Sequence, residues 1–286
     1  MAVNQPRWSD VARQFAVVFG AIFQIYASYG VGRSVGAIAQ ELRSLITPAT
    51  YAFSIWGPIF ILCLAYGIYQ ALPAQRENSI LRAIGWWTAG AFIANGAWSY
   101  IFTNRQFILA EAILLAGFVF VGGAYLRFAR EAPATRASNF GNRLIGPTLG
   151  LLFGWLTAAS VVGLASTLIS QGFAAAGQGA EIGGGALLLA GGAVACFVIL
   201  ASRDRPYGAW IAYGAALLWA LAGVIIEQRS GSNITISAAL IAAALVLLVM
   251  FSPGAVRSRS LSGSLRPLPI QSRGSVARQM SPPETQ

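Results

Sequence analysis

The sequence contains neither lysine nor histidine, and each absence excludes a class of site. Without lysine there is no residue for a retinal Schiff base, a pyridoxal phosphate aldimine or the phosphate-binding lysine of a P-loop. Without histidine, haem held by two imidazoles and the usual zinc sites are excluded. Cys63 and Cys196 both fall inside long apolar runs, where we expect buried free thiols rather than a disulfide.

Charged residues are also scarce, at 10% of the 286 residues, against 56% hydrophobic residues. A soluble domain carries roughly a quarter charged residues, so this composition indicates a membrane protein. Eight apolar runs have about the 20 residues that a transmembrane helix needs. Long uninterrupted runs exclude a β-barrel, and the sequence predicts an all-α polytopic bundle. The predicted spans are Phe15–Val31, Tyr51–Ala71, Ala83–Thr103, Phe107–Phe128, Leu144–Ser170, Ile182–Ser202, Ala209–Glu227 and Ile234–Phe251.

All 19 basic residues are arginines, and with eight spans they divide unevenly between the two sides of the membrane. Fifteen lie on the side that holds both termini, and only Arg33, Arg43, Arg105 and Arg229 lie on the other. Cytoplasmic loops are enriched in arginine, so we expect a multi-pass protein of the bacterial inner membrane with both termini in the cytoplasm. The same asymmetry accounts for the net charge of +10 without a nucleic-acid partner.

The chain divides into four predicted segments. Residues 1–14 form a cytoplasmic leader, 15–170 a core of five helices and 171–251 a unit of three further helices. Residues 252–286 are rich in Ser, Arg and Pro, a composition that predicts a disordered, basic cytoplasmic tail.

The sixth apolar run carries small residues at helical spacing. Ala186 and Ala190 lie four residues apart, and Gly183 and Ala193 extend the same face. Small side chains allow helices in a membrane to approach closely, so we expect this face to contact another helix, either in the same chain or in a second protomer.

Aromatic side chains recur on one face of the second run, which follows Pro48 in the segment TPATYAFSIWGPIF. Phe53, Trp56 and Phe60 occupy positions i, i+3 and i+7, which share one side of an α-helix. A helix that merely crosses lipid does not need this pattern. The alternative is ordinary packing between helices.

Further candidate residues lie in the next three runs. The third contains Asn95 and Trp98 in ANGAWSYIF, the fourth contains Glu111 in FILAEAILL, and the fifth contains Trp155 in GPTLGLLFGWLTAAS. A helix rises about 1.5 Å per residue, so Trp56, Asn95, Trp98 and Glu111 lie roughly 6 to 12 Å below the outer ends of their spans. Trp155 lies about 20 Å deep by the same measure, where it would form the floor of an outward-facing cavity.

Taken in order, these four segments resemble the TspO/MBR family of tryptophan-rich sensory proteins. The resemblance implies the five-helix core over 15–170 and leaves the last three helices without a counterpart. The chain also departs from the family pattern, with Pro48-Ala49 in place of paired prolines and Val161 or Val162 near a frequent Asn.

The resemblance implies a hydrophobic, planar ligand, a tetrapyrrole such as porphyrin or haem, bound for sensing, sequestration or transport. No cofactor is required, the other partner is membrane lipid, and a homodimer is expected because family members are often dimeric. The ligand-binding residues implied are Phe53, Trp56, Phe60, Asn95, Trp98, Glu111 and Trp155.

Two other classes of function remain open. One is a transporter of a small amphipathic metabolite, coupled to protons through Glu111. Acidic residues inside the membrane usually face a cavity or a partner, as this mechanism requires. Alternatively, Glu111 extends to the interface beside Arg105. An enzyme that degrades its ligand is the third class, although the sequence shows no nucleophile with a base and an orienting residue.

Overall fold

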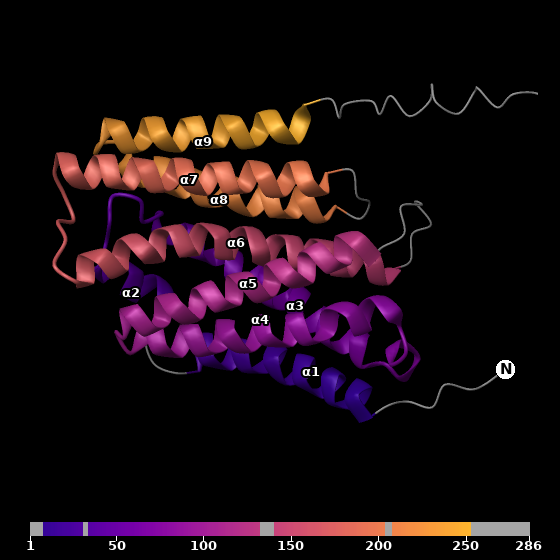
Figure 1. The fold of residues 1–286 in the computed structure, drawn as a ribbon. Helices are drawn as coiled ribbons and strands as arrows, with labels where there is room; N and C mark the ends of the chain where they lie inside the picture. Colours follow the sequence, from indigo (N-terminus) through magenta and orange to yellow (C-terminus); the bar gives the residue numbers. More distant parts are fainter. Residues whose placement is uncertain (1–7, 31–33, 132–139, 204–207, 253–286) are drawn as a thin grey trace, which may run out of the picture. The chain divides into compact units, whose positions relative to one another are not determined.

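The computed structural model describes residues 8–30, 34–131, 140–203 and 208–252, and every regular element within them is a helix. Long helices form the bundle seen in Figure 1, and their order follows the chain. They are α1 (Trp8–Tyr29), α3 (Trp56–Ala71), α4 (Ser79–Thr103), α5 (Phe107–Glu131), α6 (Phe140–Ser170), α7 (Gln178–Ser202), α8 (Ala209–Gln228) and α9 (Asn233–Phe251). The short elements are α2 (Val35–Glu41) and two 3₁₀ helices, Thr50–Ile55 and Pro73–Gln75.

The long helices coincide with the eight predicted spans, and the largest difference is at the N-terminus. Helix α1 begins at Trp8 rather than Phe15, so residues 8–14 of the predicted leader are helical. Asp10, Arg13 and Gln14 in this stretch are buried and make hydrogen bonds. Arg13 donates from Nη1 to the carbonyl oxygen of Leu81 at 3.2 Å, and Asp10 pairs with Arg82 at 2.6 Å. Such partners allow polar residues to be buried in the bundle.

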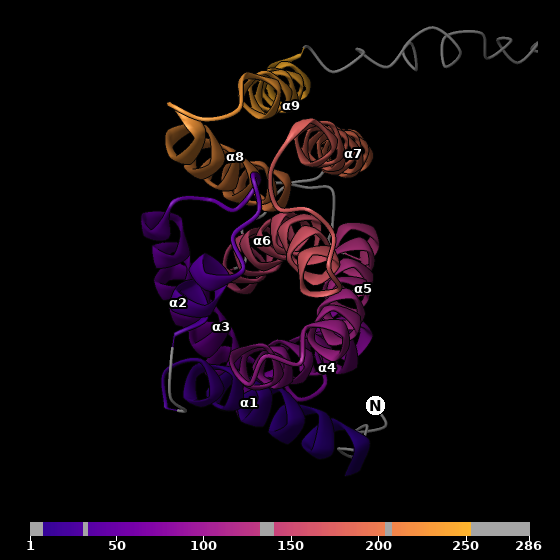
Figure 2. The ribbon, with the colours of Figure 1, turned by 90° about the vertical axis from the view of Figure 1, so that its left-hand side faces the viewer.

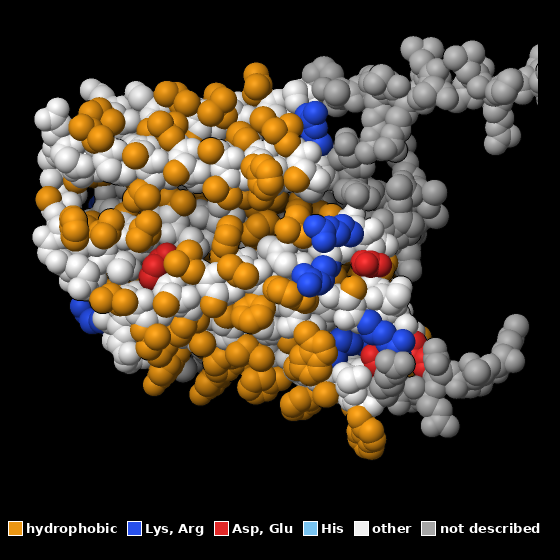
Figure 3. Space-filling model, viewed as in Figure 1, with side chains coloured by type: hydrophobic (Ala, Val, Ile, Leu, Met, Phe, Trp, Pro, Cys, Tyr) orange, Lys and Arg blue, Asp and Glu red, His pale blue; other side chains and the backbone are white. Residues whose placement is uncertain are grey.

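By length and composition, seven of the described helices can cross a membrane. One of them is α3 together with the 3₁₀ helix before it, from Thr50 to Ala71. Helix α4 is not among the seven because its Trp, Asn, Gly and Ser residues lower its hydropathy. It is nevertheless 25 residues long and packs against α1 and α5. The start of α1 and the end of α9 lie at the same end of the bundle (Figure 1). On the face in Figure 3, arginines gather toward that end and apolar side chains cover the middle.

Glycines bring α6 and α8 together. A Cβ atom at Gly150 would lie 2.0 Å from the carbonyl oxygen of Ala209, and one at Gly154 would lie 2.3 Å from that of Tyr213. Only glycine permits the backbones to approach this closely. Helix α6 therefore lies between the first helices and the group formed by α7, α8 and α9, as Figure 2 shows.

Helix α7 packs against α9 through a different face from the predicted one. Ala186 and Ala190 are exposed, and no atom lies within 4 Å of a Cβ atom placed at Gly183. The close contacts are instead those of Gly185 and Gly192, where added Cβ atoms would lie 3.5 and 3.0 Å from the side chains of α9 alanines. Two small-residue faces run along this helix, and the predicted one meets no other helix within the described chain. Contact of that face with a second protomer stays a prediction.

Candidate functional site

The segment before α3 is fastened to α8, far away in the sequence. The amide N–H of Ala49 donates to the carbonyl oxygen of Gly223 at 3.1 Å. The indole N–H of Trp219 donates to the carbonyl oxygen of Ala52 at 2.9 Å. A Cβ atom at Gly223 would lie only 2.8 Å from that of Pro48, so glycine is required for this contact. These bonds hold the segment before α3, which forms one wall of the candidate site, in place against α8.

Local structure in this wall differs from the predicted continuous helix. Residues Thr50–Ile55 form a 3₁₀ helix, and the α-helix starts only at Trp56. Pro58 lacks an N–H donor and is tolerated within the first turn of α3. Phe53 therefore projects from the 3₁₀ helix and Trp56 from the first residue of α3.

Trp56 is the centre of an aromatic cluster. Its ring centroid lies 5.9 Å from that of Trp98 on α4 and 5.9 Å from that of Trp155 on α6. Phe53 meets Trp155 edge to face at 6.1 Å. Edge-to-face and offset arrangements at these distances are the favoured geometries of aromatic pairs. Three helices and the preceding 3₁₀ helix thus bring their aromatic side chains to one place.

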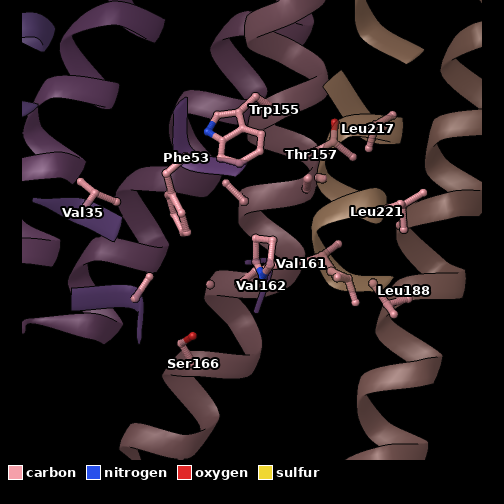
Figure 4. Close-up of a pocket in the computed structure, with 18 of the residues that line it drawn as sticks. Val35, Phe53, Trp155, Thr157, Val161, Val162, Ser166, Leu188, Leu217 and Leu221 are labelled. Atoms are coloured by element: carbon pink, nitrogen blue, oxygen red, sulfur yellow. The ribbon is translucent and has the colours of Figure 1, made fainter. Parts of the chain in front are cut away.

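A narrow cavity adjoins this cluster and contains about 80 Å³ of free volume. Figure 4 shows Phe53 and Trp155 on one side of it. The lining residues before α7 include Val35, Ala39, Pro48, Phe53, Trp56, Trp98, Phe102, Phe107, Glu111, Trp155, Ala159, Val162, Gly163 and Ser166. The cavity also reaches α7, α8 and α9.

Three buried polar atoms of cavity-lining residues have no hydrogen-bond partner within the described part of the chain. They are Nε1 of Trp56, Nε1 of Trp155 and Oε1 of Glu111. The three residues are only 6%, 3% and 7% exposed, respectively. Buried polar groups are normally satisfied, and leaving one unpaired costs about 1 to 3 kcal/mol. The residues line the cavity, but the three atoms themselves are covered by neighbouring groups, so two donors and a carboxyl oxygen would become available to a bound molecule when the cavity widens.

Helix α6 makes room for the carboxyl group of Glu111. A Cβ atom at Gly163 would lie 2.2 Å from Oε2 of Glu111. Arg105 does not pair with this carboxylate, because Arg105 forms an ion pair with Glu41 at the end of α2. The alternative in which Glu111 extends to the interface beside Arg105 is therefore wrong.

Two of the predicted residues lie outside the cavity lining. Phe60 stacks behind Trp56 at 5.2 Å and meets Tyr29 of α1. Asn95 is buried and donates from Nδ2 to Oε1 of Gln24 at 2.9 Å. The structure thus places Phe60 and Asn95 in contacts between helices.

Several lining residues were not among the predicted ones. Phe102 stacks on Trp98 at 5.5 Å and meets Phe107 at 5.6 Å, which extends the aromatic wall to α5. Phe102 continues the spacing of Asn95 and Trp98, so the pattern contained a signal for it. Helix α2 was not predicted, although Ser34 marks its start by accepting a hydrogen bond from the amide of Ala37 at 3.2 Å.

The fold and the cavity define the class of this chain as a polytopic α-helical membrane protein with an aromatic-lined internal cavity. The family model described as TSPO-like protein matches residues 11–252, and the chain belongs to this family. The match includes α7, α8 and α9, so these helices fall within the family model. No curated protein and no solved structure matches the chain.

Proposed function

We propose that this protein binds a hydrophobic, planar ligand of the tetrapyrrole class in the aromatic cavity, for sensing, sequestration or transport. The observation that carries the proposal is the set of unpaired polar atoms on Trp56, Trp155 and Glu111, which line one aromatic cavity. Aromatic walls suit a flat π-system, and the two indole N–H groups suit acceptor atoms at its edge. The family membership supports the same class of ligand.

Binding of a tetrapyrrole requires the cavity to widen, because ligand pockets typically enclose about 300 to 1,000 Å³. The free volume of about 80 Å³ is far below that range. The contacts that must open are those between the rings of Trp56, Trp98 and Trp155. A planar ligand replaces these contacts with its own stacking contacts, so the exchange retains aromatic packing.

Titration of the purified protein with protoporphyrin, followed by tryptophan fluorescence, tests the proposal. We expect saturable quenching in the wild type and weaker binding in Trp56→Ala and Trp155→Ala. Trp86→Ala is the matched control, because Trp86 is 52% exposed and lies outside the cavity lining. Quenching that stays unchanged in both cavity variants would exclude this pocket.

A second candidate function is proton-coupled transport of a small amphipathic metabolite. The observation that favours it is the buried carboxyl group of Glu111, inside a membrane-spanning helix and facing the cavity. Ionisable residues within membrane helices commonly serve as proton relays. In proteoliposomes, substrate movement would then respond to a pH gradient in the wild type and in Glu181→Gln, but not in Glu111→Gln. Movement that is indifferent to both the gradient and the Glu111→Gln change would rule this mechanism out.

A further inference from the structure

The cavity continues past α6 into a second compartment, which we call the aliphatic compartment. It lies among α6, α7, α8 and α9, and Figure 4 shows Val161 between Phe53 on one side and Leu188 on the other. Its lining includes Thr157, Val161, Leu188, Gly191, Gly192, Ala195, Leu217, Leu221 and Val246.

Helix packing explains why space remains here. Helix α8 is held against α6 by Gly150 and Gly154, and α7 is held against α9 by Gly185 and Gly192. These two helix pairs leave an interval between α6 and α7, across which Gly191 faces Val161. The position of the compartment therefore follows from where the glycines lie on α6 and α7.

The chemistry of the aliphatic compartment differs from that of the aromatic wall. Its lining side chains are aliphatic or glycine except for Thr157 on α6. The hydroxyl of Thr157 is already satisfied, because it donates to the carbonyl oxygen of Phe153 at 2.8 Å and lies 3.2 Å from the hydroxyl of Tyr213. This surface offers nothing to a polar group and suits a hydrocarbon.

Small residues on α6 connect the two compartments. Trp155 and Ala159 are four residues apart and share the face toward the aromatic cluster, whereas Val161 projects toward the other side of the helix. Ala158 and Ala159 both line the cavity and place only methyl groups beside the passage. The whole cavity has about 80 Å³ of free volume, so this part must also widen to admit a chain, and a thin, flexible chain requires less widening than a flat disc does.

We propose that the ligand is a ring that carries a long hydrocarbon chain, with the ring among Phe53, Trp56 and Trp155 and the chain in the aliphatic compartment. This inference rests on the proposed function for its ring and adds the class of substituent. The chain is of acyl or isoprenoid type. The three C-terminal helices thereby become part of the binding site.

The test compares two esters of one tetrapyrrole ring, a methyl ester and a long-chain isoprenoid ester, which have the same charge. Burial of two further methylene groups corresponds to about tenfold in affinity, so the long-chain ester is expected to bind the wild type at least about tenfold more tightly. Ala195→Leu fills the compartment and is expected to abolish this difference, while the affinity for the methyl ester changes by less than about twofold.

Ala193→Leu is the matched control, because Ala193 is exposed on the same helix and lines neither compartment. This variant is expected to bind the long-chain ester more tightly than the methyl ester, as the wild type does. The comparison of the two variants distinguishes binding in the compartment from partition of the chain into detergent. Unchanged methyl ester binding shows that Ala195→Leu is folded. Equal affinities of the two esters for the wild type, or a chain advantage that survives Ala195→Leu, would overturn the inference while the proposed function stands. If neither ester binds, both fail.

Discussion

At the scale of single residues, the indole N–H groups of Trp56 and Trp155 set the chemistry of the site. Each is buried against other aromatic rings and has no acceptor within the described residues. Buried tryptophan N–H groups usually find a partner. We interpret the two unpaired N–H groups as donors that form hydrogen bonds to acceptor atoms of the ligand.

Replacement of Trp155 by Phe keeps an aromatic ring and removes the donor. A neutral hydrogen bond contributes about 0.5 to 1.5 kcal/mol net, so we expect protoporphyrin affinity to fall by roughly twofold to tenfold. The ligand-free protein is not expected to lose thermal stability through the missing donor, since its N–H group had no partner. Fluorescence titration and thermal unfolding measure the two quantities. Trp86→Phe serves as the control, and unchanged affinity in Trp155→Phe would contradict this role of the N–H group.

The sequence predicted part of this residue-level picture. Phe53, Trp56, Trp98, Glu111 and Trp155 were chosen from helical spacing, depth and resemblance, and the structure brings all five to one cavity. Their contact with a ligand stays a prediction. The same spacing did not distinguish residues facing the cavity from those behind it, because an aromatic face on a helix is broad enough to contact two neighbours.

At the scale of elements, glycines of α6 allow its backbone to lie directly against the backbone of α8. Gly154→Val would place methyl groups against the carbonyl oxygen of Tyr213, which lies 2.3 Å from a Cβ atom at this position. Overpacking typically costs 1 to 3 kcal/mol, and we expect a loss of at least about 2 kcal/mol here because the obstacle is backbone. Thermal unfolding in detergent tests this, with Gly183→Val on the open surface of α7 as the control. Equal stability of the two variants would show that α8 does not depend on this glycine.

Helix boundaries were largely predictable because apolar runs of membrane length are a strong signal. The seven-residue α2 was missed, since it is too short to show a helical period. The contact of Ala49 and Ala52 with α8 joins segments more than 160 residues apart, as the bond from Trp219 to Ala52 shows. No local pattern predicts such a contact, and it is this contact that places α8 beside the site.

At the scale of the whole molecule, the sequence divided the chain into a core and three additional helices, whereas the cavity extends through both. Helix α6 contributes Trp155 to one compartment and Val161 to the other. The described chain begins and ends at the same end of the bundle, where arginines gather (Figures 1 and 3). That this end faces the cytoplasm stays a prediction from the arginine distribution, which a reporter fused after Gln286 would test.

Photolabelling with a porphyrin that carries a diazirine, followed by mapping of the labelled peptides, tests whether the ligand binds in the aromatic cavity. We expect labelling around Trp56, Trp98 and Trp155, which excess unlabelled protoporphyrin abolishes. Labelling confined to the exposed aromatic side chains of α1, such as Phe15 and Phe19, and insensitive to the competitor would contradict binding in this cavity.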